Sequence, residues 1–384
     1  MITFDAVTKR YPDGTIAVDA LDLEVPDGKT VVLVGPSGCG KTTSLRMINR
    51  LIEPTEGTIL LDGKDIRQGN PAQLRRGIGY VIQQTGLFPH RTVEDNIGTV
   101  PVLNGWSRKK ARDRATELLS LVGLDPSLAK RYPHQLSGGQ QQRVGVARAL
   151  AADPPVLLMD EPFSAVDPVV RASLQELLLS LQAELRKTIV LVTHDIEEAI
   201  KVGDLVALFR PHGKIAQLAP PDELLATPAD DYVAGFVGFD RGIRRLSFVP
   251  TLELALSTGP VLPADATVAK ARAAGQPWIL VTEPDGGAPR GWVNTATLAD
   301  LPAEAPLAEV ETAAGGHSFT VGTDSLRAAL DAAVLSPAGQ AVGVDGAGRV
   351  LGVASFDQLR EAIQAADSGP EGARAGTYQR GPRP

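Results

Sequence analysis

The sequence has little of several features that mark other classes of protein. It has one cysteine in 384 residues, which excludes an internal disulfide and fits a reducing compartment. No apolar run approaches the roughly 18 residues that a membrane-spanning helix needs. The formal net charge of −7 argues against a nucleic-acid surface. The first residues lack the basic and apolar regions of a signal peptide.

A phosphate-binding loop is the most informative feature that is present. Residues 35–42 read Gly-Pro-Ser-Gly-Cys-Gly-Lys-Thr after the apolar run 30–34, which predicts a strand, a loop and a helix. The glycines let backbone N–H groups surround a polyphosphate, Lys41 neutralises its charge, and Thr42 offers a hydroxyl to Mg²⁺. The sequence therefore predicts a bound nucleoside triphosphate. The residues predicted to hold it here are Gly35, Pro36, Ser37, Gly38, Cys39, Gly40, Lys41, Thr42 and Thr43.

Two further motifs follow along the chain. Residues 136–140 read Leu-Ser-Gly-Gly-Gln and precede an alanine-rich helical stretch that runs to residue 150. The apolar strand 156–159 then ends in Asp160 and Glu161. Two carboxylates at the end of such a strand indicate chemistry: Asp160 would hold Mg²⁺ and Glu161 would act as general base toward the attacking water.

Together these motifs resemble those of ATP-binding-cassette (ABC) ATPases. The resemblance covers residues 1–240 and implies an α/β P-loop domain with a helical subdomain at 88–150. It implies that ATP and Mg²⁺ are bound by a homodimer in which Ser137, Gly138, Gly139 and Gln140 contact the γ-phosphate of the nucleotide held by the other copy. It also implies that Tyr11 stacks on adenine and that His194 contacts the γ-phosphate. Gln83, rather than the adjacent Gln84, would contact the metal site and sense a membrane partner. The segment that ends at Asp167 would cross the dimer interface. The catalytic residues would be Glu161, His194 and Lys41, and the metal ligands Thr42, Gln83 and Asp160.

The composition changes after Gly238, where alanine, proline and glycine rise. Two similar units, 246–300 and 317–366, each offer a short helix, a strand, a glycine-containing turn and a second strand, and they resemble a tandem pair of CBS regulatory modules of α+β type. Nucleotide-binding modules of that family carry Asp where this chain has Thr297 and Gln358. We therefore expect a dimer contact, a cyclic dinucleotide or ions there rather than AMP or ATP. Residues 368–384 are predicted to be disordered.

Among ABC ATPases, the chain most resembles subunits of glycine betaine/carnitine/choline importers. Residues 81–90, residues 96–101 and the CBS-like pair carry this resemblance. It implies an ATPase at the cytoplasmic face of the membrane that drives two transmembrane permease subunits fed by a substrate-binding protein. Two alternatives stay open: an importer for methionine or another amino acid, and a soluble ABC-type switch. The single cassette and the segment around Gln83 argue against the switch.

Overall fold

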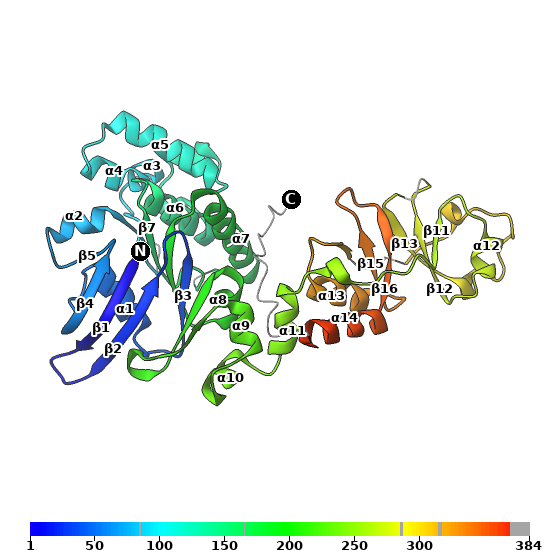
Figure 1. Cartoon of the computed structure of the whole chain (residues 1–384). Helices are drawn as coiled ribbons and strands as arrows, with labels where there is room; N and C mark the ends of the chain where they lie inside the picture. Colours follow the sequence, from blue (N-terminus) through cyan, green and yellow to red (C-terminus); the bar gives the residue numbers. More distant parts are fainter. Residues whose placement is uncertain (84–85, 165, 285–286, 314–316, 369–384) are drawn as a thin grey trace. The chain divides into compact units, whose positions relative to one another are not determined.

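The computed structural model describes residues 1–83, 86–164, 166–284, 287–313 and 317–368. The chain divides into two compact units, Met1–Phe239 and Asp240–Pro384 (Figure 1). Gln84, and the predicted tail from residue 369 onward, lie outside the described residues. In the described part of the chain, no helix is both long and apolar enough to cross a membrane.

The first unit contains, within the described residues, a six-stranded sheet in the order β10-β9-β3-β8-β7-β6. Neighbouring strands are parallel except for the antiparallel pair β9 and β10. Every residue of β3, β7 and β8 is buried, as expected for parallel strands that are covered on both faces. The strands are β3 (Thr30–Val34), β6 (Ile78–Val81), β7 (Val156–Asp160), β8 (Thr188–Thr193), β9 (Leu205–Phe209) and β10 (Ile215–Ala219).

A second, antiparallel sheet of this unit has the order β2-β1-β4-β5. It consists of β1 (Ile2–Arg10), β2 (Ile16–Val25), β4 (Glu56–Leu61) and β5 (Lys64–Asp65). One apolar core contains residues of both sheets and of the helix after β3, including Phe4, Leu33 and Leu45. This shared core fixes the loop between β3 and that helix against both sheets.

Helices of the first unit surround the parallel sheet (Figure 1). They are α1 (Lys41–Ile48), α2 (Pro71–Arg76), α3 (Val93–Ile97), α4 (Thr99–Leu103), α5 (Arg108–Leu121), α6 (Gly138–Leu150), α7 (Pro168–Leu185), α8 (Ile196–Val202), α9 (Pro221–Ala226) and α10 (Asp231–Val237). The Ser107 hydroxyl caps α5 by accepting a hydrogen bond from the Lys110 N–H at 3.2 Å.

The register of the parallel strands gathers three loops at one edge of the sheet. Val34 pairs with Thr193, and Asp160 pairs with Val192, so β3, β8 and β7 end side by side. Ligand sites of open α/β sheets lie at this carboxyl edge. The phosphate loop, Glu161 and His194 therefore leave the sheet at the same place.

The second unit contains two sheets with the same connectivity. In each, the first strand pairs in parallel with the second, and the second pairs antiparallel with the third. The elements are α11 (Arg241–Arg245), β11 (Val261–Pro263), α12 (Val268–Ala273), β12 (Trp278–Thr282), β13 (Pro289–Asn294), β14 (Ser318–Thr320), α13 (Leu326–Leu335), β15 (Gln340–Val344), β16 (Val350–Ser355) and α14 (Phe356–Ser368). Leu280 and Trp292 of one sheet share an apolar cluster with Val342, Val344 and Val353 of the other.

Candidate active site

The phosphate loop needs glycine at two points where the backbone is crowded. Gly35 and Gly40 have φ angles of +151° and +106°, in the region that favours glycine. A Cβ on Gly40 would lie 2.4 Å from the Ala17 carbonyl oxygen, and one on Gly35 would lie 2.7 Å from the Phe209 carbonyl oxygen. Any side chain at either position would displace the loop from the sheet that supports it.

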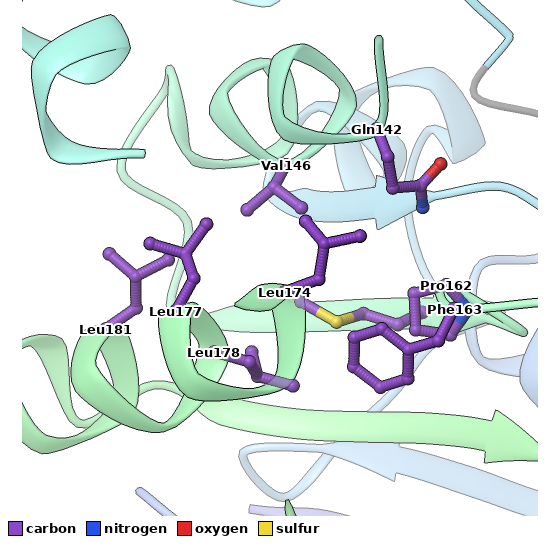
Figure 2. Close-up of a pocket in the computed structure, with 9 residues that line it drawn as sticks. Gln142, Val146, Pro162, Phe163, Leu174, Leu177, Leu178 and Leu181 are labelled. Carbon is purple, nitrogen blue, oxygen red and sulfur yellow. The ribbon is translucent and has the colours of Figure 1, made fainter. Parts of the chain in front are cut away.

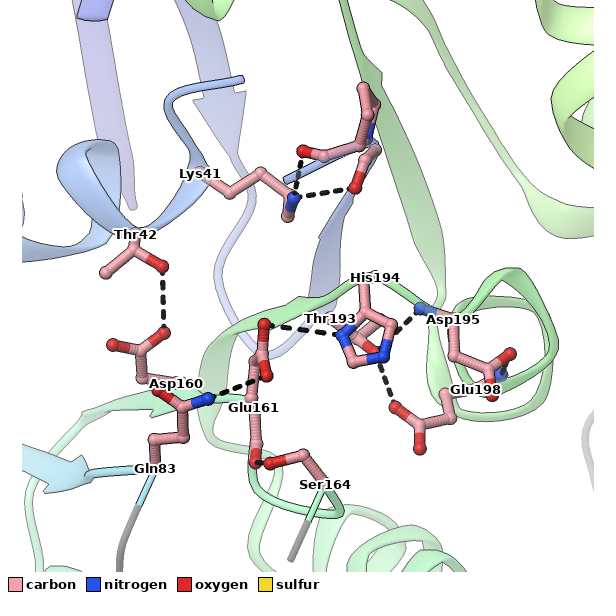
Figure 3. A network of polar contacts seen from close by, with 12 residues as sticks. Lys41, Thr42, Gln83, Asp160, Glu161, Ser164, Thr193, His194, Asp195 and Glu198 are labelled. Atoms are coloured by element: carbon pink, nitrogen blue, oxygen red, sulfur yellow. Dashed lines mark hydrogen bonds and ion pairs between the residues drawn. The ribbon is translucent and has the colours of Figure 1, made fainter. Parts of the chain in front are cut away.

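Lys41 begins α1 and is 6% exposed. Its ammonium donates hydrogen bonds to the carbonyl oxygens of Gly35, at 2.7 Å, and of Pro36, at 2.9 Å (Figure 3). The loop thus curls around a buried positive charge at the N-terminus of a helix. A cation and a helix N-terminus together attract phosphate.

Asp160 and Thr42 form the second part of the site. The Thr42 hydroxyl donates a hydrogen bond to the Asp160 carboxylate at 3.1 Å (Figure 3). Burial raises the pKa of Asp160, an effect that Thr42, Arg46 and Lys41 partly oppose. A buried carboxylate beside a hydroxyl is a hard-oxygen donor set that suits Mg²⁺. Among the described residues, no group of three or more His, Cys, Asp or Glu side chains could hold a metal ion.

Glu161 occupies an unusual backbone position directly after β7. Its φ of +45° lies in the left-handed region, which costs a non-glycine residue about 1–3 kcal/mol. The Glu161 N–H donates to the Val192 carbonyl oxygen at 2.9 Å, and the Ser164 hydroxyl donates to the Glu161 carbonyl oxygen at 3.0 Å. These bonds turn the Glu161 side chain out of the strand direction and fix its backbone.

The Glu161 carboxylate meets side chains from two other segments (Figure 3). The Gln83 amide donates to Oε2 at 2.9 Å, and His194 Nδ1 lies 3.3 Å from Oε1. His194 follows β8, and its side chain is 58% exposed, whereas that of Glu161 is 21% exposed. The three residues therefore form one cluster that is open to solvent on the His194 side. Such a cluster can orient a water molecule and accept its proton.

Residues 136–140, called the signature motif from here on, lie at the exposed N-terminus of α6. The Ser137 hydroxyl accepts a hydrogen bond from the Gln140 N–H at 3.3 Å, and the Gln140 side chain accepts one from the Ser137 N–H at 2.9 Å. This capping box is a structural role that the sequence pattern S-x-x-Q could have indicated. Asp167 likewise caps α7 by accepting from the N–H groups of Val169 and Val170. The contacts predicted for these residues across a dimer stay predictions.

The structure thus brings the predicted residues into two groups at one sheet edge. Lys41, Thr42 and Asp160 surround the phosphate loop, while Gln83, Glu161 and His194 share a carboxylate. Tyr11 lies just after β1, with the Lys9 ammonium 5.4 Å from its ring centre, and its contact with adenine stays a prediction.

Sequence reasoning missed two charged residues behind His194, namely Arg171 and Glu198. The Thr193 hydroxyl donates to the buried Glu198 carboxylate, and Arg171 of α7 lies near it. The pattern Asp-x-x-Glu at 195–198 resembles a capping pair. That pattern was the one signal in the sequence that pointed to Glu198.

Comparison with known proteins assigns the family. A sequence model described as ABC transporter matches residues 18–164. The glycine betaine/carnitine/choline transport ATP-binding protein OpuCA of Bacillus subtilis is 50% identical over 272 residues, which is 71% of this chain and 71% of the relative. The chain belongs to the ATP-binding proteins of ABC transporters. It is an ATPase coupled to transport, and ATP is its cofactor.

Other relatives agree with this assignment. The osmoprotectant import ATP-binding protein OsmV of Salmonella typhimurium is 54% identical over 254 residues, 65% of this chain and 66% of the relative. A solved dimer of the ATP-binding cassette MJ0796 in a post-hydrolysis state with ADP and Pi shares 36% identity, with a TM-score of 0.53. It covers 58% of this chain and 99% of its own length. The fold of the first unit is therefore that of an ABC cassette.

Proposed function

We propose that this ABC ATPase energises the uptake of a quaternary-amine osmoprotectant of the glycine betaine, carnitine or choline type. The observation that carries this proposal is the 50% identity to OpuCA, a transport protein for these three solutes by name, over 71% of both chains. OsmV, an osmoprotectant import protein by name, supports the same direction of transport. The chain would act as a peripheral subunit at the cytoplasmic face of the membrane.

We further propose two copies of this chain per transporter, bound to two transmembrane permease subunits that a substrate-binding protein supplies. The dimeric state of the MJ0796 cassette supports the pairing. In such a dimer, the exposed N-terminus of α6, with Ser137 as its cap, would face the nucleotide of the second copy.

The geometry supports a definite division of roles in hydrolysis. Lys41 would leave the carbonyl oxygens of its own loop and bind the β- and γ-phosphate oxygens of ATP. Thr42 and Asp160 would hold Mg²⁺, with Gln83 near that site, and the ion would neutralise charge that develops on the phosphates. Glu161 would take a proton from the attacking water, while Gln83 and His194 position the carboxylate and His194 also contacts the γ-phosphate.

We also propose that residues 246–366 form a pair of CBS-type regulatory modules. The repeated connectivity of the two sheets supports this proposal, and so does the apolar cluster that joins them. By the resemblance to CBS modules, Thr297 and Gln358 replace the Asp that contacts a ribose in nucleotide-binding members. The Thr297 hydroxyl donates to the Asn294 carbonyl oxygen, and the Gln358 side chain accepts from the Ser355 N–H. Both side chains are thus engaged locally, which favours ions or a cyclic dinucleotide over AMP.

Uptake into vesicles tests the substrate. The chain is reconstituted with its membrane subunits and binding protein, and ATP-dependent uptake of labelled glycine betaine, carnitine, choline and methionine is compared. We expect uptake of at least one quaternary amine and none of methionine. Methionine uptake without quaternary-amine uptake would contradict the substrate assignment but leave the ATPase assignment intact.

The same vesicles test the regulatory role. A chain that ends at residue 239 should keep basal ATP hydrolysis but lose the response of transport to salt or to a cyclic dinucleotide. The coupling expected of such a module is about 5- to 150-fold. Calorimetry on the full chain should detect no AMP binding. An unchanged salt response after truncation, or tight AMP binding, would contradict the regulatory proposal.

A further inference from the structure

Helix α7 is packed against the signature helix α6 through its first two turns. A Cβ on Gly139 would lie 2.5 Å from Val170 Cγ1, so the backbone of the signature motif rests on α7. Arg143 of α6 donates hydrogen bonds to the Ser173 hydroxyl at 2.6 Å and to the Val122 carbonyl oxygen at 2.7 Å. A displacement of the signature motif must therefore move the start of α7.

The interface between α6 and α7 leaves little empty space. Apolar side chains from both helices, such as Val146 and Leu174, line a cavity of about 10 Å³ (Figure 2). Such a cavity has room for about one water molecule. The Gln142 Nε2 group is buried at its edge, with no hydrogen-bond partner among the described residues. The cavity is too small for a ligand, and the two helices move together because they interlock.

The same turn of α7 contacts the segment that carries His194. Arg171 Nε lies 3.8 Å from Glu198 Oε1, and Arg171 Nη1 lies 3.9 Å from Asp195 Oδ2. Glu198 Oε2 accepts a hydrogen bond from the Thr193 hydroxyl at 2.5 Å. Thr193 Oγ1 in turn accepts one from the Asp195 N–H at 3.1 Å (Figure 3). These bonds enclose His194, since Thr193 and Asp195 are its neighbours in the chain.

The Arg171 guanidinium lies beyond hydrogen-bond distance from the carboxylates of Asp195 and Glu198. Arg171 Nε is buried and has no hydrogen-bond partner within the described ranges. A buried donor without an acceptor is costly, and a shift of α7 toward α8 by about 1 Å would satisfy it. The arrangement can therefore respond to the position of α7.

The charges around Glu198 give Arg171 a defined electrostatic effect. Burial raises the pKa of Glu198, and the negative charge of Asp195 raises it further. The Thr193 hydroxyl, Arg171 and His194 lower it. Removing the guanidinium would leave Glu198 beside Asp195 without that cation, so its pKa would rise and it would take up a proton at higher pH.

We propose that Arg171 is a positioning residue for ATP hydrolysis: through Glu198 and Thr193 it sets the orientation of His194 according to the position of α7. These contacts connect the signature motif to the segment that carries His194 in the same subunit. The connection runs from Gly139 to Val170 of α7, and from Arg171 of α7 to Glu198. This inference rests on the proposed role of His194.

Steady-state ATP hydrolysis by the full chain tests the inference. Arg171→Met removes the charge but keeps the length of the side chain, and at 35% side-chain exposure the change is compatible with folding. We expect kcat to fall by about 10- to 100-fold, as for a misplaced catalytic group, with KM for ATP nearly unchanged. The ratio of wild-type to variant kcat should shrink as the pH rises, because a higher pH ionises Glu198 even without Arg171. Arg171→Lys should recover part of the loss.

A matched control removes a different ion pair between the same two helices. The Glu176 carboxylate of α7 and the Lys201 ammonium of α8 lie 3.0 Å apart. Glu176→Gln should leave kcat and its pH profile as in the wild type. If kcat falls equally in Glu176→Gln and Arg171→Met, Arg171 only stabilises the packing of the two helices, and the proposal is overturned. An Arg171→Met kcat within about twofold of wild type at every pH would also overturn it, since misplacement costs far more.

Two further variants separate this inference from the proposed role of His194. If Arg171 acts through Glu198, the double variant Arg171→Met, Glu198→Gln should lose no more activity than the worse single variant, whereas independent effects would multiply and contradict the link. His194→Ala should lose at least as much activity as Arg171→Met. If His194→Ala stays active while Arg171→Met does not, the proposed role of His194 fails, and with it the route assigned to Arg171.

Discussion

Replacing Glu161 with Gln is the most direct test of the chemistry. The amide has the shape of the carboxylate, so its oxygen can still accept from Gln83 and its NH₂ group can donate to His194 Nδ1. The contact with His194 is open to solvent on the histidine side, and even a charged pair at a protein surface contributes only about 0–1 kcal/mol to stability. We therefore expect the variant to fold and bind ATP almost as the wild type does.

The loss should appear in turnover, because the amide cannot accept the proton of the attacking water. Removing a positioned base lowers the rate by about 10²- to 10⁴-fold, which corresponds to about 3–5 kcal/mol in the barrier. Phosphate release measures kcat, and size-exclusion chromatography with ATP should show the variant accumulating as a dimer. The control Gln83→Ala removes a partner of the carboxylate but not the base, so its loss should be smaller. Hydrolysis by Glu161→Gln at a near wild-type rate would refute the assignment of Glu161 as the base.

Two other predictions concern the phosphate loop and the signature. Lys41→Ala and Ser137→Ala should each be inactive, yet their mixture should regain activity, because each heterodimer contains one intact composite site. The control is Ser107→Ala, which removes an equivalent N-cap from α5. It controls for the roughly 1 kcal/mol of stability that a lost N-cap costs. No recovery at any ratio, with heterodimers verified, would count against a shared site. N-ethylmaleimide should inactivate the wild type slowly, because Cys39 is only 2% exposed. The adduct should block the phosphate loop, because the Cys39 sulfur lies 3.6 Å from the Lys41 ammonium, while Mg-ATP should protect the thiol and Cys39→Ser should resist. Full activity after stoichiometric labelling would contradict this.

The local parts of the site were predictable from the sequence for physical reasons. A phosphate loop is built from consecutive residues, so the spacing of its glycines and its lysine is enough to predict their roles. The apolar runs before residue 35 and before Asp160 indicated buried strands, and β3 and β7 are buried throughout. In the second unit, β12, β13, β15 and β16 are the two strands predicted for each of the two similar units, whereas the sequence did not indicate the short strands β11 and β14.

The groups behind His194 were not predictable in the same way. Arg171 and Glu198 lie on polar positions of two helices, where a sequence reader expects solvated charges. Their proximity depends on how α7 packs on α8, which is a tertiary property with no local signal. The contact between Gly139 and Val170 is similar: the motif indicated a phosphate-binding glycine, and the structure adds a packing requirement at the same residue.

The geometry around Glu161 explains how a base can be held firmly and still react. Its backbone is fixed by the hydrogen bonds to Val192 and Ser164, so the left-handed conformation is maintained against strain. Its carboxylate contacts the side chains of Gln83 and His194, which engage one oxygen each. A carboxylate offers about four lone-pair sites, so both oxygens can still accept a hydrogen bond from water. Gln83 and His194 can therefore orient the Glu161 carboxylate and still leave it accessible to water. A rotation of either side chain would change the orientation of the carboxylate while the backbone of Glu161 stays in place.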